Sequence, residues 1–205
     1  VYDVMRQQIE LSLGRGLDVA LQGKGHLLES QIERTLADTQ ALAVRPFLVQ
    51  SMQQLHAQSD DSSALKDLER VVYSLMQSGF SAAAVYNLHG NILSQAGHFS
   101  EKYTQSLPLN KLTNTFLIWD GKFILHTDKE VFDQDGERIG SITTESTLPH
   151  LTRSFGEIRT IGETGVFMLC APPKESDKNM ACLTSKADGI KFKYLASMVE
   201  EGGVL

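Results

Sequence analysis

The sequence has little of what several classes of protein require. Its best apolar runs, Phe116–Trp119 and Val166–Ala171, are far shorter than the roughly 18 residues of a membrane-spanning helix. Positive charge is not in excess, because 25 acidic residues outnumber 19 Lys and Arg for a net charge of −6. This balance argues against a nucleic-acid surface. With only five prolines and two cysteines in 205 residues, the chain is neither low-complexity nor dependent on disulfides for a core.

Motifs for catalysis and for metal or phosphate binding are also missing from the sequence. No Gly-x-Ser-x-Gly elbow occurs, and the six histidines form no His-Glu-x-x-His or His-x-His pair. The glycines of Gly14–Gly16 and Gly23–Gly25 lie within a helical pattern, where they cannot present N–H groups at a helix start. Asp133–Gly136 imitates a calcium loop, but Val131 and Ile142 stand where oxygen ligands are needed. We therefore predict no enzymatic activity, no cofactor and no metal site.

The N-terminal quarter of the chain has the pattern of a long helix. Apolar residues mostly three or four apart, from Ile9 to Ala43, predict one apolar stripe, and Pro46 should break or kink the rod. The four glycines of this segment weaken a helix. Either a second helix packs closely along them, as in a parallel dimer, or they merely weaken a frayed end. Because the chain opens at Val1 without Met, we expect a piece of a longer protein whose flanks held membrane spans.

The rest of the chain predicts short helices and antiparallel strands. Helices are expected over Phe47–Leu55, Ala64–Gln77 (with Ser62 or Ser63 as N-cap), Leu148–Phe155 and, weakly, Tyr194–Glu201. Period-two patterns and two Asp-Gly turns predict strands over Phe80–Asn87, Asn91–Gln95, Phe116–Trp119, Lys122–Thr127, Glu130–Asp133, Arg138–Glu145, Val166–Ala171 and Met180–Thr184. The helices and strands are segregated rather than alternating, so the predicted fold class is α+β.

The two cysteines lie in one predicted hairpin. Cys170 ends one strand and Cys182 lies in the next, so their side chains come within disulfide reach if the strands pair. A disulfide would suit an oxidising compartment. The alternative is a pair of free thiols in a cytosolic protein. Spacing favours the disulfide.

Several short segments together resemble the double Cache family, the extracytoplasmic sensor domains of bacterial histidine kinases, diguanylate cyclases and chemoreceptors. They are the long helix with Ala43-Val44-Arg45-Pro46-Phe47, Val85-Tyr86-Asn87-Leu88-His89-Gly90-Asn91, Asp135-Gly136-Glu137-Arg138-Ile139-Gly140, and Ile161-Gly162-Glu163-Thr164-Gly165. The resemblance implies a long N-terminal helix (1–57), a membrane-distal PAS-like domain (58–147), and a connecting helix with an incomplete membrane-proximal domain (148–205).

The resemblance also implies where a ligand would bind. Family members usually bind ligands at the distal sheet, and amino-acid sensors use a terminal Asp where this chain has Glu145. The segment Gly97–Thr115 lacks the clustered Arg, Trp and Tyr of those sensors. The strand residues that would line a pocket are Tyr86, Trp119, His126, Asp128 and Glu145. The alternative for each is an ordinary sheet residue.

Taken together, these features predict a periplasmic ligand-sensing domain of an inner-membrane receptor. The receptor predicted first is a two-component sensor histidine kinase, and the alternatives are a diguanylate cyclase or phosphodiesterase, or a chemoreceptor. The expected partners are a small-molecule ligand and a second copy paired along the N-terminal helix, with no nucleic acid. Membrane attachment would come only through the missing spans. A rival prediction is an intracellular PAS-like interaction module without a ligand.

Overall fold

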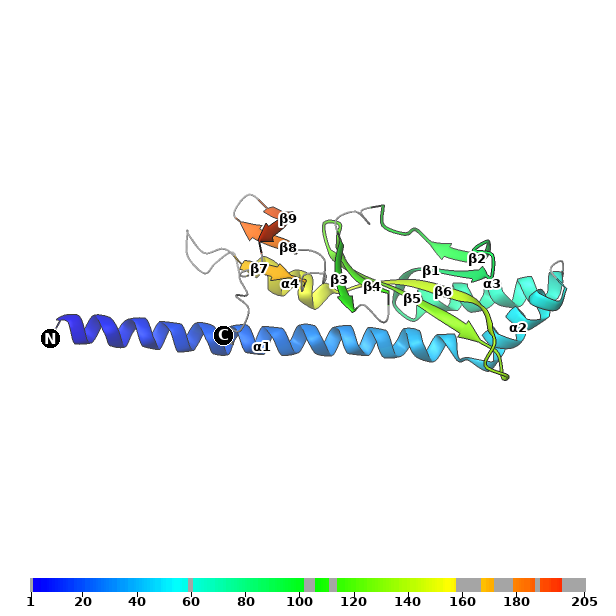
Figure 1. Ribbon diagram of the computed structural model, residues 1–205, viewed down its shortest axis with the longest axis horizontal. Helices are drawn as coiled ribbons and strands as arrows, with labels where there is room; N and C mark the ends of the chain where they lie inside the picture. Colours follow the sequence, from blue (N-terminus) through cyan, green and yellow to red (C-terminus); the bar gives the residue numbers. More distant parts are fainter. Residues whose placement is uncertain are drawn as a thin grey trace. The chain divides into compact units, whose positions relative to one another are not determined.

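The computed structural model describes residues 2–58, 61–101, 106–110, 114–157, 167–171, 179–186 and 189–196. Its elements run α1 (Tyr2–Ala43), α2 (Pro46–Ala57), α3 (Ser62–Gln77), β1 (Phe80–Asn87), β2 (Ile92–Gly97), β3 (Ser106–Asn110), β4 (Thr115–Trp119), β5 (Phe123–Phe132), β6 (Arg138–Thr147), α4 (Pro149–Glu157), β7 (Phe167–Cys170), β8 (Asn179–Lys186) and β9 (Gly189–Ala196) (Figure 1). The α+β class is confirmed.

By its internal contacts the chain divides into two units, Val1–Arg34 and Thr35–Leu205. The first unit is the greater part of α1, on which Val19, Leu21 and Leu27 are exposed. The second contains the last turns of α1 and all the other elements. The predicted domain boundaries after residues 57 and 147 stay a prediction.

The predicted break at Pro46 lies between α1 and α2. Arg45 adopts an extended conformation (φ −63°, ψ 125°), as residues before proline commonly do, and Pro46 opens α2 where its missing N–H costs nothing. The predicted cap of α3 was wrong. Asp61 accepts hydrogen bonds from the N–H groups of Ser63 (2.9 Å) and Ala64 (3.2 Å), so the helix begins one residue after a carboxylate cap.

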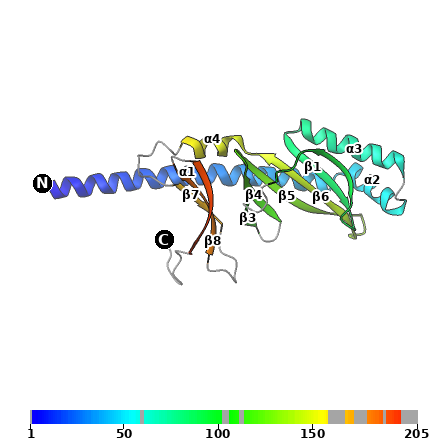
Figure 2. The same ribbon diagram turned by 90° about the horizontal axis from the view of Figure 1, so that it is seen from above.

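Six antiparallel strands form one sheet in the order β2-β1-β6-β5-β4-β3. Helices α2 and α3 lie against this sheet (Figure 2). Leu48, Met52 and Leu68 from the helices are almost completely buried with Val85 and Ile142 from the sheet. Burying each such side chain contributes about 1.5–3 kcal/mol, so this layer is the main core beneath the sheet.

A second, three-stranded sheet has the order β7-β8-β9. Cys170 pairs with Cys182 across β7 and β8, and the two form the predicted disulfide. The predicted helical tail over Tyr194–Glu201 was wrong where the structure describes it, because Tyr194–Ala196 belongs to β9. Residues 197–205 lie outside the described residues.

Candidate functional site

The two faces of the six-stranded sheet differ in chemistry. Along β5 and β6 successive side chains point to opposite faces. His126 and Asp128 pair with Glu145 and Thr143, so these four share one face. The neighbouring residues, such as Ile142 and Val131, face the helices and join the core. The face that carries these four polar side chains is therefore the candidate functional site.

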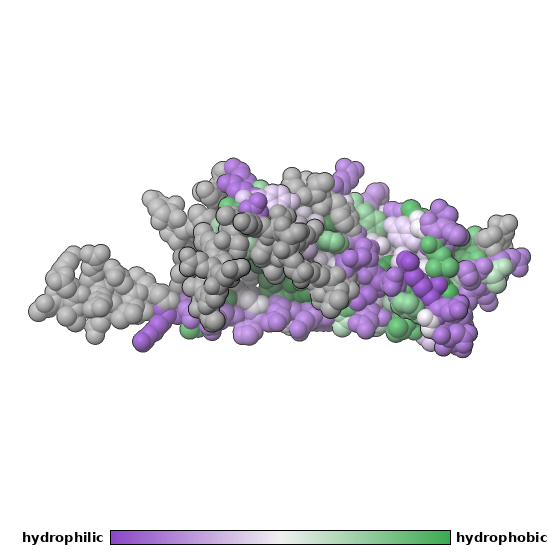
Figure 3. All heavy atoms as spheres, viewed as in Figure 1, coloured by the Kyte–Doolittle hydropathy of each residue, from purple (hydrophilic) through white to green (hydrophobic). Residues whose placement is uncertain are grey.

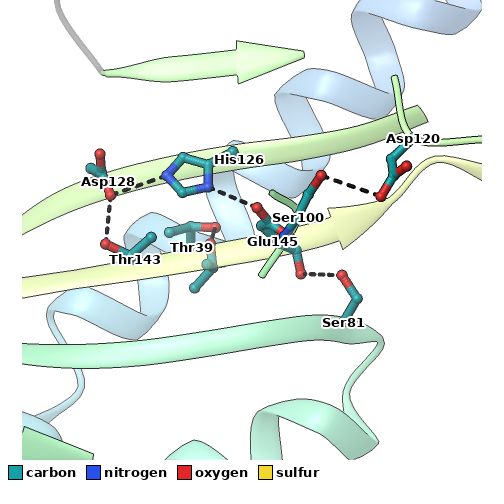
Figure 4. Close-up of polar contacts among 9 residues, drawn as sticks. Thr39, Ser81, Ser100, Asp120, His126, Asp128, Thr143 and Glu145 are labelled. Carbon is teal, nitrogen blue, oxygen red and sulfur yellow. Dashed lines mark hydrogen bonds and ion pairs between the residues drawn. The ribbon is translucent and has the colours of Figure 1, made fainter. Parts of the chain in front are cut away.

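His126 is the centre of a polar cluster on that face (Figure 4). It is only 3% exposed. Its Nδ1 lies 3.1 Å from Oε1 of Glu145, and its Nε2 lies 3.4 Å from Oδ1 of Asp128. A neutral imidazole has one N–H, so only the doubly protonated ring can donate toward both carboxylates. The rings of Phe99 and Phe116 lie 6.1 Å and 6.3 Å from the imidazole.

Glu145 contacts three segments of the chain: β5, β1 and the segment around Ser100. It is 1% exposed. Besides contacting His126, its Oε2 accepts the backbone N–H of Ser100 at 2.9 Å, and its backbone carbonyl accepts the hydroxyl of Ser81 at 3.1 Å. The hydroxyl of Ser100 also donates to Asp120 at 3.5 Å. The segment around Ser100 is thus fastened to the sheet by a buried carboxylate.

Asp128 is the exposed end of the cluster. Its side chain is 35% exposed, and its Oδ1 accepts the hydroxyl of Thr143 at 2.5 Å. Tyr86 on β1 belongs to the same environment. Burial, reinforced by the negative charge of Asp128, raises the pKa of Tyr86 above its ordinary value of 10.0, while a hydrogen bond with Thr143 opposes the shift.

The opposite face of β6 contacts the long helix. Thr144 precedes Glu145 and points to the helix side, where its hydroxyl lies 3.0 Å from that of Thr39 on α1. Thr39 and Thr144 are 0% and 1% exposed, and Thr39 also donates to the carbonyl of Thr35 at 3.0 Å. One strand therefore touches the polar cluster and the end of α1 through adjacent residues.

The structure brings four of the five predicted ligand residues together and separates the fifth. Tyr86, His126, Asp128 and Glu145 share the polar face. Trp119 pairs with Phe123 and lies on the opposite face, with the two rings 4.9 Å apart, and Phe123 in turn packs on Phe155 of α4 at 5.0 Å. The predicted roles stay predictions.

Sequence reasoning missed several neighbours of the cluster: Phe99, Ser100, Phe116 and Thr143. Thr143 and Phe116 could have been found from strand register, because they pair across from Asp128 and His126. Ser100 lies outside any strand, and no sequence pattern indicated its contact with Glu145.

A pocket of about 560 Å³ opens beside the cluster. Asp128 belongs to both, and the other polar residues that line the pocket are Gln40, Asn114, Lys129, Glu130, Arg138 and Ser141. Ala43, Val44 and Phe132 supply apolar walls. Its volume is typical of small-molecule sites.

The cluster is not arranged as a metal centre. Its two carboxylates contact the two nitrogens of one ring instead of converging on a common point. Within the described residues, no group of three His, Cys, Asp or Glu side chains could hold a metal ion.

In the same part of the chain, no helix combines the length and apolar character needed to cross a membrane.

Comparisons with known proteins find similarity in structure only. No family model matches the chain, and no curated protein matches its sequence. Among solved structures, the chain is similar to the ligand-binding domain of the amino acid chemoreceptor PctC of Pseudomonas aeruginosa PAO1 in complex with GABA. That match has a TM-score of 0.43 and 16% sequence identity, and it covers 70% of this chain and 64% of the other. The match thus spans less than two thirds of that domain.

Proposed function

We propose that this chain is a ligand-sensing domain of a membrane-bound signalling receptor, and that it binds a small molecule without transforming it. The observation that carries the proposal is that strand β6 contacts both the polar cluster and helix α1. Glu145 holds the polar cluster on one face, and Thr144 contacts Thr39 of α1 on the other. A ligand that displaces β6 therefore acts on α1 directly, with a coupling energy typically of about 1–3 kcal/mol.

The more specific proposal is a periplasmic domain of double Cache type in an inner-membrane protein. The disulfide between Cys170 and Cys182 supports an oxidising compartment over the intracellular alternative. A two-component sensor histidine kinase remains the receptor we propose first, with a diguanylate cyclase or phosphodiesterase and a chemoreceptor as alternatives. Sequencing the full gene of the receptor tests which of these output domains it encodes.

A thermal-shift screen of small carboxylates, amines and purines tests the sensing function. A true ligand at one hundred times its Kd should stabilise the fold by about 2.7 kcal/mol. Glu145→Gln should weaken that stabilisation, because it removes the charge that holds the cluster. Glu137→Gln, an exposed change in the β5–β6 turn, is the matched control. Turnover of a bound compound, or no stabilisation by any class, would contradict the proposal.

We also propose that two copies pair along α1. Exposed Val19, Leu21 and Leu27 support this, as do Gly23 and Gly25, which have no neighbouring atoms within 4 Å of an added Cβ. Deleting residues 1–21 should lower the dimer fraction in sedimentation velocity. An unchanged oligomeric state after the deletion excludes this interface.

A further inference from the structure

A small groove lies where the break between α1 and α2 meets the β5–β6 hairpin. We call it the hairpin groove, and it is lined by residues from the segments 43–50 and 130–134. It adjoins the larger pocket beside the polar cluster, with which it shares Val44 and Phe132. Its volume of about 320 Å³ is near the lower limit of small-molecule pockets, so it suits a side chain of a partner better than a whole ligand.

The walls of the hairpin groove expose apolar side chains to solvent. Val44 is 69% exposed and Phe132 is 47% exposed, whereas Ala43 and Val49, which also line the groove, are at most 9% exposed. In the space-filling view, hydrophobic surface is visible beside hydrophilic surface over α2 and the β5–β6 hairpin (Figure 3). Exposed apolar side chains that gather around a concave site mark a surface that another molecule covers.

The hairpin side of the groove is held in place by contacts within the hairpin itself. Oδ1 of Asp133 accepts the backbone N–H groups of Asp135 at 2.9 Å and of Glu137 at 2.8 Å. Glu130 pairs with Arg138 on the neighbouring strand at 3.1 Å. This wall is therefore formed before a partner arrives, which reduces the entropy that is lost on docking.

The charge of the hairpin defines the chemistry of the partner. Residues 128–138 contain five acidic side chains and two basic ones. Asp135 and Glu137 are exposed at the turn, while Arg138 is already paired. Arg45, at the helix break, is exposed but is not among the residues that line the groove. The groove therefore combines apolar walls with an acidic edge.

The acidic edge argues against two kinds of occupant. In a two-fold contact with a second copy, the hairpin would face the same hairpin, and like charges would repel one another. An anionic membrane surface is repelled for the same reason. Opposite charge favours and steers association, so a basic protein surface is the occupant that fits.

We propose that the hairpin groove is a docking site for a separate protein that inserts one apolar side chain beside Val44 and Phe132. Lysine or arginine side chains that flank the apolar residue lie against Asp135 and Glu137. This inference goes beyond the proposed sensing function, because the partner binds at the helix break and not at the polar cluster.

Three fluorescein-labelled peptides test the chemistry of the groove by fluorescence anisotropy with the whole chain. The first is Gly-Lys-Arg-Leu-Lys-Arg-Gly, the second has serine in place of leucine, and the third has glutamate in place of every basic residue. We expect the first to bind about tenfold more tightly than the second, because only leucine buries an apolar side chain in the groove. The third should not bind, since its charges repel the hairpin.

Three variants connect this binding to the groove. Phe132→Ser and Val44→Ser should each weaken binding of the leucine peptide about tenfold and leave binding of the serine peptide unchanged. Tyr73→Ser, at an exposed aromatic residue of α3, is the matched control and should leave the binding of both peptides unchanged. Thermal melting of each variant without peptide shows that it is folded, as the exposure of all three side chains leads us to expect.

Photo-cross-linking in the full-length receptor, in its own cells, tests which molecule occupies the groove. The photoreactive amino acid p-benzoylphenylalanine in place of Gln134, which lines the groove, should cross-link to a different protein. The cross-linked peptide should contain an apolar residue flanked by lysine or arginine. Cross-links only to a second copy or to lipid overturn the inference, as do equal affinities for the leucine and serine peptides or binding that Phe132→Ser and Val44→Ser leave unchanged. Stabilisation by a small molecule is measured separately, so the sensing function stands or falls on its own test.

Discussion

At the scale of single residues, the buried pair of His126 and Glu145 should contribute measurably to the stability of the fold. Both side chains are at most 3% exposed. His126→Leu leaves the carboxylate of Glu145 buried without its main counter-group, which should lower the free energy of unfolding by about 3–5 kcal/mol. Adding Glu145→Met should recover part of the loss, because no carboxylate is then buried without its partner, while the N–H of Ser100 loses this acceptor. Chemical denaturation of the two single variants and the double variant measures this cycle. Strictly additive losses would show that the pair is not coupled.

A second residue-scale prediction concerns Tyr86. Its pKa is raised in the folded state, so the fold favours the neutral phenol. The resulting stability is fully present below the unfolded pKa of about 10 and is lost as pH rises through the folded value. The wild type should therefore lose free energy of unfolding relative to Tyr86→Phe only at strongly alkaline pH.

Absorbance titration of the tyrosinates provides the direct measurement. Tyr86→Phe should remove a transition above pH 10, and the same titration of Tyr73→Phe, at an exposed tyrosine of α3, is the comparison. If Tyr86→Phe instead removes the transition that occurs at the lowest pH, the pKa of Tyr86 is not raised.

The candidate site shows how far sequence reasoning extends at this scale. His126, Asp128 and Glu145 were predicted as pocket residues, and alternation along β5 and β6 places them on one face. Trp119 was predicted with them, but it lies three residues after Phe116 on β4. This odd spacing places the two side chains on opposite faces of the sheet. The contact between Ser100 and Glu145 joins residues that are 45 positions apart in the sequence, and Ser100 lies in a segment outside any strand. Such a contact follows from tertiary packing, which no local pattern reports.

At the scale of elements, strand β2 depends on one glycine. Gly97 has φ +75° and pairs with Ala82 of β1, where an added Cβ would lie 2.2 Å from the carbonyl oxygen of Ser81. Gly97→Ala therefore adds a steric clash of about 1–3 kcal/mol to the backbone strain of about 1–2 kcal/mol. Gly90→Ala shares the positive φ but meets no atom within 4 Å, so it should show the strain alone. Equal melting temperatures for the two variants would contradict this account.

The elements that the sequence did not predict have identifiable physical reasons. Strand β3 contains Pro108, which lowers strand propensity and is tolerated because β3 is at the edge of the sheet. The predicted strands Lys122–Thr127 and Glu130–Asp133 are one strand, because Asp128 and Lys129 continue to pair with β6 despite their charge. In β9, the alternation from Ile190 to Leu195 indicates a strand that the helical reading overlooked.

At the scale of the whole molecule, the disulfide should stabilise one sheet selectively. Cys170 and Cys182 are 12 residues apart, and closing so short a loop contributes about 3 kcal/mol in the chain-entropy account. Replacing both by serine should speed amide hydrogen exchange in β7, β8 and β9. The amides of β1, β5 and β6 serve as an internal control and should keep their protection. Uniform acceleration across both sheets would show that the cross-link stabilises the chain globally.

The position of Trp119 has a practical consequence for anyone who works with this protein. It is the single tryptophan of the chain, and its ring makes an edge-to-face contact with Phe123 on the side of the sheet away from His126 and Asp128. Its intrinsic fluorescence should therefore follow the packing of α4 through Phe155 and remain almost silent when the polar side is occupied. An optical assay for occupancy needs an extrinsic dye placed near Asn114 or Ser141.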